Sequence, residues 1–121
     1  MKSYEVLYKT FENDFFWNGK DKNFNLQIDD DLKKYIMVRR EKVHGIQYIF
    51  AFNNNFGLSV IKAPCTYGYD EDMWECAMLQ YLENLYKYEL YYCKLTNFDV
   101  LGYMSDERVN RLLRQVKEWK E

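Results

Sequence analysis

Apolar and polar residues alternate through the middle of the chain, and this alternation predicts a β-hairpin. Ile46, Tyr48, Phe50 and Phe52 occupy every second position, and a second apolar run follows at 58–62. The stretch between the two runs is rich in Asn and ends in Gly, which is typical of a turn because both residues accept a positive φ at low cost. We therefore predict a central hairpin over residues 46–62.

Shorter patterns predict further strands around this hairpin. Residues 23–28 alternate strictly between amide and apolar side chains, as in a half-buried strand. A helical turn at 30–34, opened by the Asp-rich stretch before it, leads into a β-prone segment. The predicted additional strands are 23–28, 35–43, 73–81 and 88–93.

The C-terminal residues 105–119 predict an amphipathic helix. Ser105 precedes acidic residues in the first turn, and lysines occupy the last turn, which is the charge order that the helix dipole favours. The apolar stripe consists of Val109, Leu112, Leu113, Val116 and Trp119. We predict an α+β fold, in which an antiparallel sheet of four to six strands carries this helix on one face, against the rings of Tyr48, Phe50 and Phe52.

Length and composition indicate one domain over residues 1–121, with a variable part at 1–44 and the sheet and helix in 45–121. One Pro and five Gly leave no linker, and aromatic residues make up 19% of the 121 residues. In the variable part, residues 4–9 fit a short strand or a first helical turn, and the aromatic cluster at 11–17 favours a helix. We find no signal peptide and no apolar run long enough to span a membrane, so we expect a cytoplasmic location.

Catalytic chemistry has few candidate residues. The chain has one histidine, His44, which precedes a turn glycine and is expected at the surface. Of the three cysteines, Cys76 and Cys93 fall within strand patterns, whereas Cys65 lies beside a loop and is the one candidate for a reactive thiol. A thiol-dependent enzyme centred on Cys65 is therefore an alternative, but we expect free thiols and no enzyme.

The sequence also contains no pattern that is typical of a cofactor or metal site. The acidic runs 29–31 and 70–72 could supply oxygen ligands to a divalent cation, but neither matches a known calcium loop. Solvated turns and a helix cap explain them better. The glycine-rich phosphate loops and the serine-hydrolase elbow are missing as well, so we expect neither a cofactor nor a metal.

From Gly45 to the C-terminus the chain resembles a family of small, mostly uncharacterised proteins encoded by phages and prophages. The resemblance rests on turn glycines and core apolar positions: Gly45, Tyr48, Phe50, Phe52, Asn53, Gly57, Ser59, Val60, Ile61, Tyr67, Gly68, Trp74, Glu75, Val100, Leu101, Gly102, Tyr103, Val109, Leu112 and Leu113. It implies a shared fold and an origin in a mobile element, and it carries no catalytic residue. Phage proteins of this size often act on a host protein, which the resemblance makes the expected partner class.

The loop after the hairpin is the main candidate for a binding site. Residues 64–89 hold six acidic residues and one lysine, although the net charge of the chain is only −2. Aromatic rings beside charges are typical of protein interfaces, and acids suit a basic groove on a nucleic-acid-handling protein, such as a defence nuclease that an anti-CRISPR-like inhibitor would block. The candidate partner-binding residues are Tyr67, Tyr69, Asp70, Glu71, Asp72 and Trp74.

Alternative binding modes remain open from the sequence. The polar side of the C-terminal helix, together with Arg39 and Arg40, could follow a phosphate backbone and so bind nucleic acid. The candidate helix residues for that function are Arg108, Arg111, Arg114 and Lys117. A role in phage assembly and pairing of edge strands in a homodimer are further possibilities.

Overall fold

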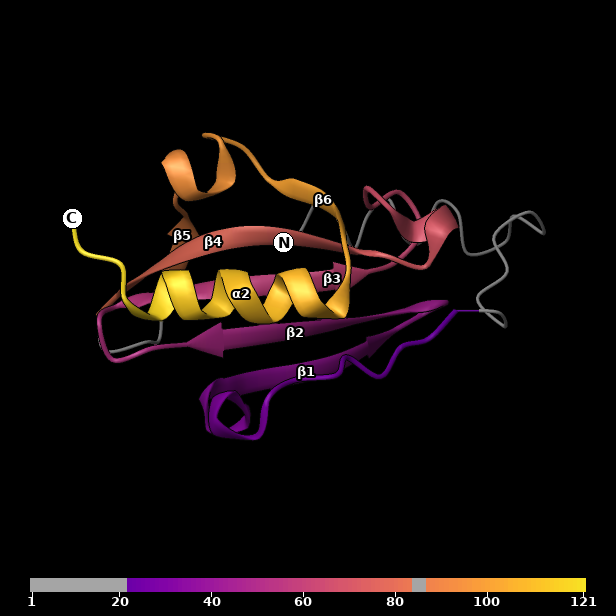
Figure 1. Ribbon diagram of the computed structural model, residues 1–121, viewed down its shortest axis with the longest axis horizontal. Helices are drawn as coiled ribbons and strands as arrows, with labels where there is room; N and C mark the ends of the chain where they lie inside the picture. The colour runs from indigo at the N-terminus through magenta and orange to yellow at the C-terminus, as the bar shows by residue number, and fades with distance from the viewer. Residues whose placement is uncertain (1–21, 84–86) are drawn as a thin grey trace.

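The computed structural model describes residues 22–83 and 87–121, and it confirms the α+β fold. In these residues six antiparallel strands form one sheet and one α-helix packs on it (Figure 1). The strands are β1 (Ile36–Lys42), β2 (Gly45–Ala51), β3 (Phe56–Lys62), β4 (Trp74–Leu82), β5 (Lys87–Leu90) and β6 (Leu101–Met104). The helix is α2 (Asp106–Lys117), and the short 3-10 turns are η1 (Asp30–Tyr35), η2 (Tyr69–Glu71) and η3 (Lys94–Thr96).

The strands follow one another across the sheet in the order β1-β2-β3-β4-β5. The last two strands share the outer edge of β4, the longest strand. β6 pairs with its first half, where Trp74 lies opposite Met104, and β5 pairs with its second half, where Leu79 lies opposite Leu90. The chain between β5 and β6 therefore runs along this edge, which is seen at the top of Figure 1.

The central hairpin is confirmed, since β2 and β3 pair without a break from Ile46 opposite Lys62 to Ala51 opposite Gly57. Its turn also fastens the helix. The side-chain amide of Asn54 donates to the backbone oxygens of Val116, Lys117 and Trp119 at 2.8–3.0 Å, which satisfies carbonyl groups left free at the end of α2.

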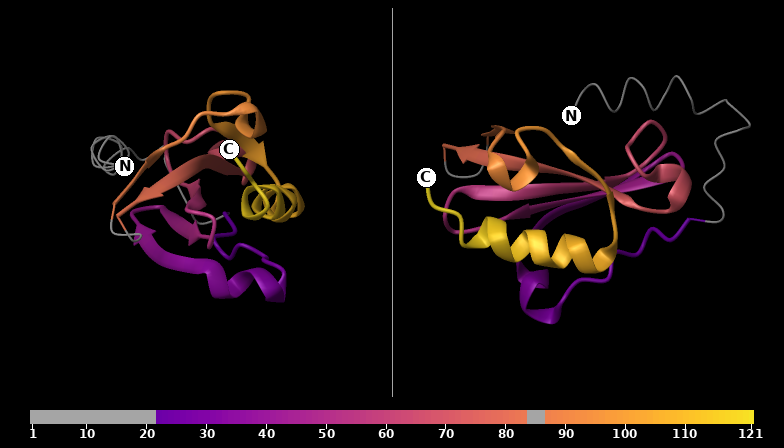
Figure 2. Two further views of the ribbon diagram at one scale, coloured as in Figure 1. Left: turned by 90° about the vertical axis from the view of Figure 1, so that its left-hand side faces the viewer. Right: turned by 45° about the horizontal axis from the view of Figure 1, so that its top comes forward.

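The helix covers one face of the sheet, which we call the first face. Val109, Leu113 and Val116 are fully buried, in one cluster with Tyr48 and Phe50 of β2, as predicted. The Ser105 hydroxyl accepts a hydrogen bond from the Arg108 amide at 3.2 Å and so begins the helix. The end-on view in Figure 2 shows α2 on one side of the sheet only.

The predicted strand at 23–28 is wrong, because this segment pairs with no strand. Leu26 and Ile28 are buried in alternation with exposed neighbours, as the pattern requires, but the backbone groups bond to side chains of the folded body. The Asp106 carboxylate accepts from the Gln27 amide, and Asn110 both donates to the Gln27 oxygen and accepts from the Asp29 amide at 2.8 Å. We call residues 22–29 the strap.

The bounds of the remaining predicted elements agree with the structure in part. The 30–34 turn and the strand after it are confirmed as η1 and β1, whereas the strand predicted at 88–93 ends at Leu90. β6 was not predicted as a strand. The expectations for 4–9 and 11–17 lie outside the described residues. Residues 22–44 pack on the rest of the sheet through the strap, η1 and β1.

Candidate functional site

Hydrogen bonds connect the loop between β3 and β4 to itself and to the neighbouring strands β4 and β6. Thr66 closes its first turn by donating to the Ala63 oxygen at 2.7 Å. The Tyr67 amide donates to the Glu75 carboxylate at 3.0 Å, and the Tyr67 oxygen accepts from the Tyr103 amide of β6 at 3.2 Å. This loop is therefore anchored to two different strands, which fixes the positions of its side chains.

Unusual backbone conformations gather in this loop and beside it. Cys65, Asp72 and Tyr103 have φ values of 74°, 58° and 55°, which are uncommon for residues with a side chain. Gly68, with a φ of 102°, lies among them, and a side chain there would meet the Tyr103 amide. Conformations of this kind cost free energy and tend to occur at functional positions. Of the eight residues with a side chain that have a positive φ in the described part of the chain, these three lie at one loop.

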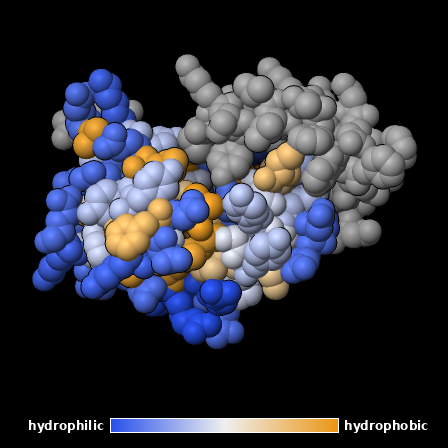
Figure 3. All heavy atoms as spheres, turned by 90° about the horizontal axis from the view of Figure 1, so that it is seen from above, coloured by the Kyte–Doolittle hydropathy of each residue, from blue (hydrophilic) through white to orange (hydrophobic). Residues whose placement is uncertain are grey.

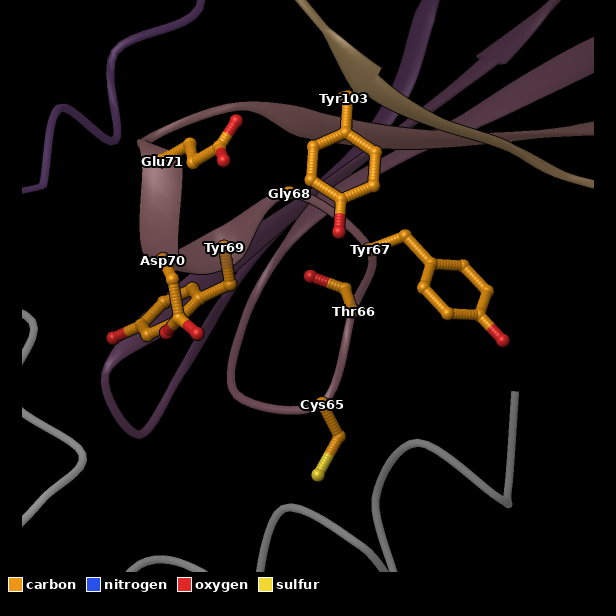
Figure 4. A pocket seen from close by; sticks show the side chains of 8 residues that line it. All are labelled: Cys65, Thr66, Tyr67, Gly68, Tyr69, Asp70, Glu71 and Tyr103. Atoms are coloured by element: carbon orange, nitrogen blue, oxygen red, sulfur yellow. The ribbon is translucent and has the colours of Figure 1, made fainter.

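Four exposed side chains surround a hollow of about 200 Å³ at this loop. Tyr67 is 60% exposed and Tyr103 is 51% exposed, and both carboxylates of η2, on Asp70 and Glu71, reach the solvent. Figure 4 shows the Tyr103 ring extending over the loop toward Thr66, while the Tyr67 ring extends away from it. We call Tyr67, Asp70, Glu71 and Tyr103 the acidic tyrosine surface.

Exposed apolar side chains continue from this surface along the β5 and β6 edge. Among the described residues, two of the large exposed apolar side chains, Met37 and Val43, lie in or beside β1, and the others lie on the loop or the edge. Those on the loop and edge are Tyr67, Leu82, Leu90, Tyr92, Phe98 and Tyr103. Figure 3, which views this edge, shows hydrophobic groups between hydrophilic ones. Such an arrangement is typical of a surface that binds another molecule.

Two of the predicted contact residues are core residues. Trp74 is 1% exposed, and its indole donates to the Asp106 carboxylate at 2.7 Å. Tyr69 is 3% exposed, and burial together with the charges of Asp70 and Asp72 raises its pKa to about 12. Neither ring can contact a partner without a rearrangement of the loop. Sequence position alone could not show this, because the partners that bury them are distant in the chain.

Asp72 has a structural function as well. Its carboxylate lies 2.7 Å from the ammonium group of Lys62, which is 2% exposed and lies over the Trp74 ring at 4.3 Å. It also accepts a hydrogen bond from the Asn23 amide of the strap. Asp72 therefore fixes the loop to the strap. Tyr103, which the sequence did not indicate as a contact residue, belongs to the candidate site instead of Asp72. The sequence shows there only an aromatic residue after a glycine, Gly102.

The basic side of α2 is partly neutralised by the protein itself. Arg114 donates to both carboxylate oxygens of Asp31 and to Asp29 at 2.8–2.9 Å. These hydrogen bonds lower the pKa of Asp31 and raise that of Arg114. Lys117 lies over the ring of Tyr35, at 5.6 Å. The four basic residues therefore do not form a continuous free stripe.

The remaining basic side chains of this row are exposed. The Arg111 guanidinium lies 3.8 Å from the Glu107 carboxylate, one turn earlier on the same helix, which is a long distance for an ion pair. Arg108 and Arg111 line a shallow groove between α2 and β6, together with apolar residues that include Leu101 and Leu112. Arg39 of β1 lies apart from them, with its guanidinium beside the ring and hydroxyl of Tyr48.

The structure places one cysteine in the loop, two in the core and the histidine in a turn. Burial raises the pKa of the Cys65 thiol, which disfavours the reactive thiolate at neutral pH. Cys76 and Cys93 are buried. His44 lies in the β1–β2 turn with a φ of 59°.

Metal binding and membrane crossing gain no support from the described residues. Residues 22–83 and 87–121 bring no three His, Cys, Asp or Glu side chains together as metal ligands, and they form no helix both long and apolar enough to cross a membrane. Comparison of the chain with protein-family models, with curated proteins and with solved structures finds no match.

Proposed function

We propose that this chain is a non-enzymatic protein-binding module and that the acidic tyrosine surface makes the contact. The observation that carries the proposal is the pair of exposed tyrosines, Tyr67 and Tyr103, joined by a backbone hydrogen bond and flanked by two exposed carboxylates. Tyrosines held by a stiff backbone lose little conformational freedom on binding and supply large contact areas.

The charge of the surface indicates the chemistry of the partner. Asp70 and Glu71 are exposed, and the ion pairs found in the described residues involve neither of them, so we expect a basic surface on the partner. A protein that handles nucleic acid has such a surface. With the resemblance to phage and prophage proteins, this leads us to propose a host protein as the target, with inhibition of a defence nuclease as the effect.

Affinity capture from host lysate tests the proposal when it is done with matched variants. The wild-type chain should enrich a host protein, and Tyr67→Ala with Tyr103→Ala should lose it. Val43→Ala is the control, because Val43 is also exposed, at 47%, but lies beside β1 and apart from the loop and the β5 and β6 edge. A double variant that retains the captured protein, or a wild-type chain that enriches none in repeated trials, would contradict the proposal.

Nucleic-acid binding is the second candidate, favoured by the exposure of Arg108 and Arg111 beside the groove. It predicts that Arg111→Glu with Arg114→Glu abolishes binding to nucleic acid and its dependence on salt. Unchanged binding in that variant would exclude this surface. A role in phage assembly is a third candidate, which capture of a virion protein in place of a host protein would support.

A further inference from the structure

The sheet has a second apolar face, opposite the face that α2 covers. The residues on it alternate with those of the first face in β2, β3 and β4, and their apolar members form a cluster around Ile49, Leu79 and Tyr81. Val38, Ala51 and Tyr88 extend this cluster to β1 and β5. Ile61 and Ala63 form a smaller cluster on β3 and the loop after it.

This second face is buried, although none of the described helices lies on it. Ile49 and Leu79 are 0% exposed and Tyr81 is 4% exposed. The α-helix and the strap contribute instead to the cluster of the first face, with Val109 and Leu26 among its members. The strands alone cannot bury these side chains, because side chains of a sheet project away from its plane. In the described residues, every member of this cluster belongs to a strand of the sheet.

We propose that residues 1–21 cover the second face of the sheet. This inference is independent of the proposed function. Apolar side chains in this segment recur at the spacing of one helix face, and they are Tyr4, Leu7, Tyr8, Phe11 and Phe15. Polar residues occupy most of the positions between them. The pattern is that of an amphipathic helix that needs an apolar surface to pack on.

The length of the segment and its point of attachment fit this placement. The apolar pattern extends over residues 4–15, and a helix of that length is about 18 Å long, which fits within the roughly 30 Å over which the nine residues of β4 extend. The segment is followed by Lys22, whose ammonium group donates to the Asp70 backbone oxygen at 3.0 Å, at the end of the sheet where β4 begins. From there, residues 1–21 can follow the whole length of the second face.

Photocross-linking in the full chain tests the placement. Benzoylphenylalanine in place of Phe11 should cross-link within one chain to β2 or β4, at residues such as Ile49 or Leu79. The same group in place of Asn13, on the opposite side of the predicted helix, should give no such product. Cross-links between two chains would show that a second copy covers the face, and cross-links to the first face or to none would also overturn the proposal.

A pair of charge variants provides an independent measurement. Phe11→Asp places a charge on the predicted apolar side, and Asn13→Asp places the same charge on the polar side. We expect Phe11→Asp alone to increase the binding of an apolar fluorescent dye severalfold and to promote self-association. Equal behaviour of the two variants would contradict the proposal, and the cross-linking result stands even if Phe11→Asp fails to fold.

Discussion

The acidic tyrosine surface and the basic side of α2 both concentrate charge, but they differ in how far the protein already uses it. On the helix, Arg114 binds two carboxylates of the strap and η1, and Lys117 lies over a ring. On the loop, Asp72 is occupied by Lys62, while Asp70 and Glu71 lie at the surface and form no ion pair within residues 22–83 and 87–121. Charges that stabilise the fold are less available for a partner, which is why we favour the loop as the binding site.

The support beneath the two surfaces differs as well. The loop is fixed by backbone hydrogen bonds to Glu75 and Tyr103 and by the buried ammonium group of Lys62. Arg108 and Arg111 lie on a regular helix and carry long, exposed side chains. A binding site needs side chains whose positions are set in advance, because ordering them on binding costs free energy. Substitutions that weaken each surface in turn should therefore have different effects.

Removal of Lys62 should have the largest effect on the loop. The Lys62 ammonium group bonds to Asp72 and to the Asn23 oxygen, both at 2.7 Å. Lys62→Ala would leave a cavity beside Trp74 and an unpaired carboxylate, so we expect the free energy of unfolding to fall by about 2–3 kcal/mol, less than for a fully buried pair because Asp72 is partly solvated. Denaturant unfolding measures this.

Lys62→Met is the matched control, because it keeps the packing on Trp74 and removes only the charge. We expect it to cost less than Lys62→Ala. Equal losses in the two variants would show that the charge and its bonds to Asp72 and Asn23, and not the packing on Trp74, give Lys62 its importance.

Substitution of Gly68 should strain the same loop by a smaller amount. Its φ of 102° is unfavourable for residues with a side chain, and a Cβ atom would lie 2.9 Å from the Tyr103 amide nitrogen. We expect Gly68→Ala to lower the free energy of unfolding by about 1–2 kcal/mol. Asp70→Ala, at an exposed position nearby, should change it by less than about 0.5 kcal/mol. A Gly68→Ala variant as stable as wild type would contradict the close packing of the loop on β6.

The basic side of the helix can be tested through the titration of Asp31. Arg114 lowers the pKa of this carboxyl in the folded protein. The resulting stabilisation is therefore present above the unfolded pKa and is lost as the pH falls through the folded pKa. In Arg114→Gln the pKa of Asp31 should rise toward its ordinary value, as followed by carboxyl NMR, whereas Arg108→Gln should leave it lowered. An unchanged pKa in Arg114→Gln would show that the arginine is free.

The smallest expected effect concerns Cys65, at the base of the acidic tyrosine surface. Because burial raises the pKa of its thiol, we expect Cys65 to react with a disulfide reagent more slowly than free cysteine near neutral pH, and faster as the pH rises. Cys65→Ser identifies the reacting group. Reaction of Cys65 faster than that of free cysteine at neutral pH would instead support an activated thiol and the enzyme alternative.

The sequence predicts the hairpin and α2 well because both are encoded locally. The alternation in β2 and the stripe around Leu113 depend only on neighbouring residues. Residues 23–28 show the limit of this reasoning, since alternation predicts which side chains are buried but not what the backbone bonds to. The strap bonds to Asp106 and Asn110, which follow it by about eighty residues.

The sequence predicts where the candidate site lies, but it does not predict which residues form it. The rings and acids of residues 65–74 indicate this loop, and of them Tyr67, Asp70 and Glu71 are exposed. Burial of Trp74 depends on a hydrogen bond to the first turn of α2, and Tyr103 reaches the loop through the pairing of β6 with β4. Such long-range contacts leave no local pattern in the sequence.

The measurement that tests the central claim most directly is charge reversal on each surface, with the host protein captured by the wild-type chain as the ligand. We predict that Asp70→Lys with Glu71→Lys weakens binding at least about tenfold, equivalent to about 1.4 kcal/mol, and reduces its dependence on salt. Arg108→Glu with Arg111→Glu should leave the affinity unchanged. The opposite pattern, with binding lost only when the arginines are reversed, would contradict the assignment of the acidic tyrosine surface as the binding site.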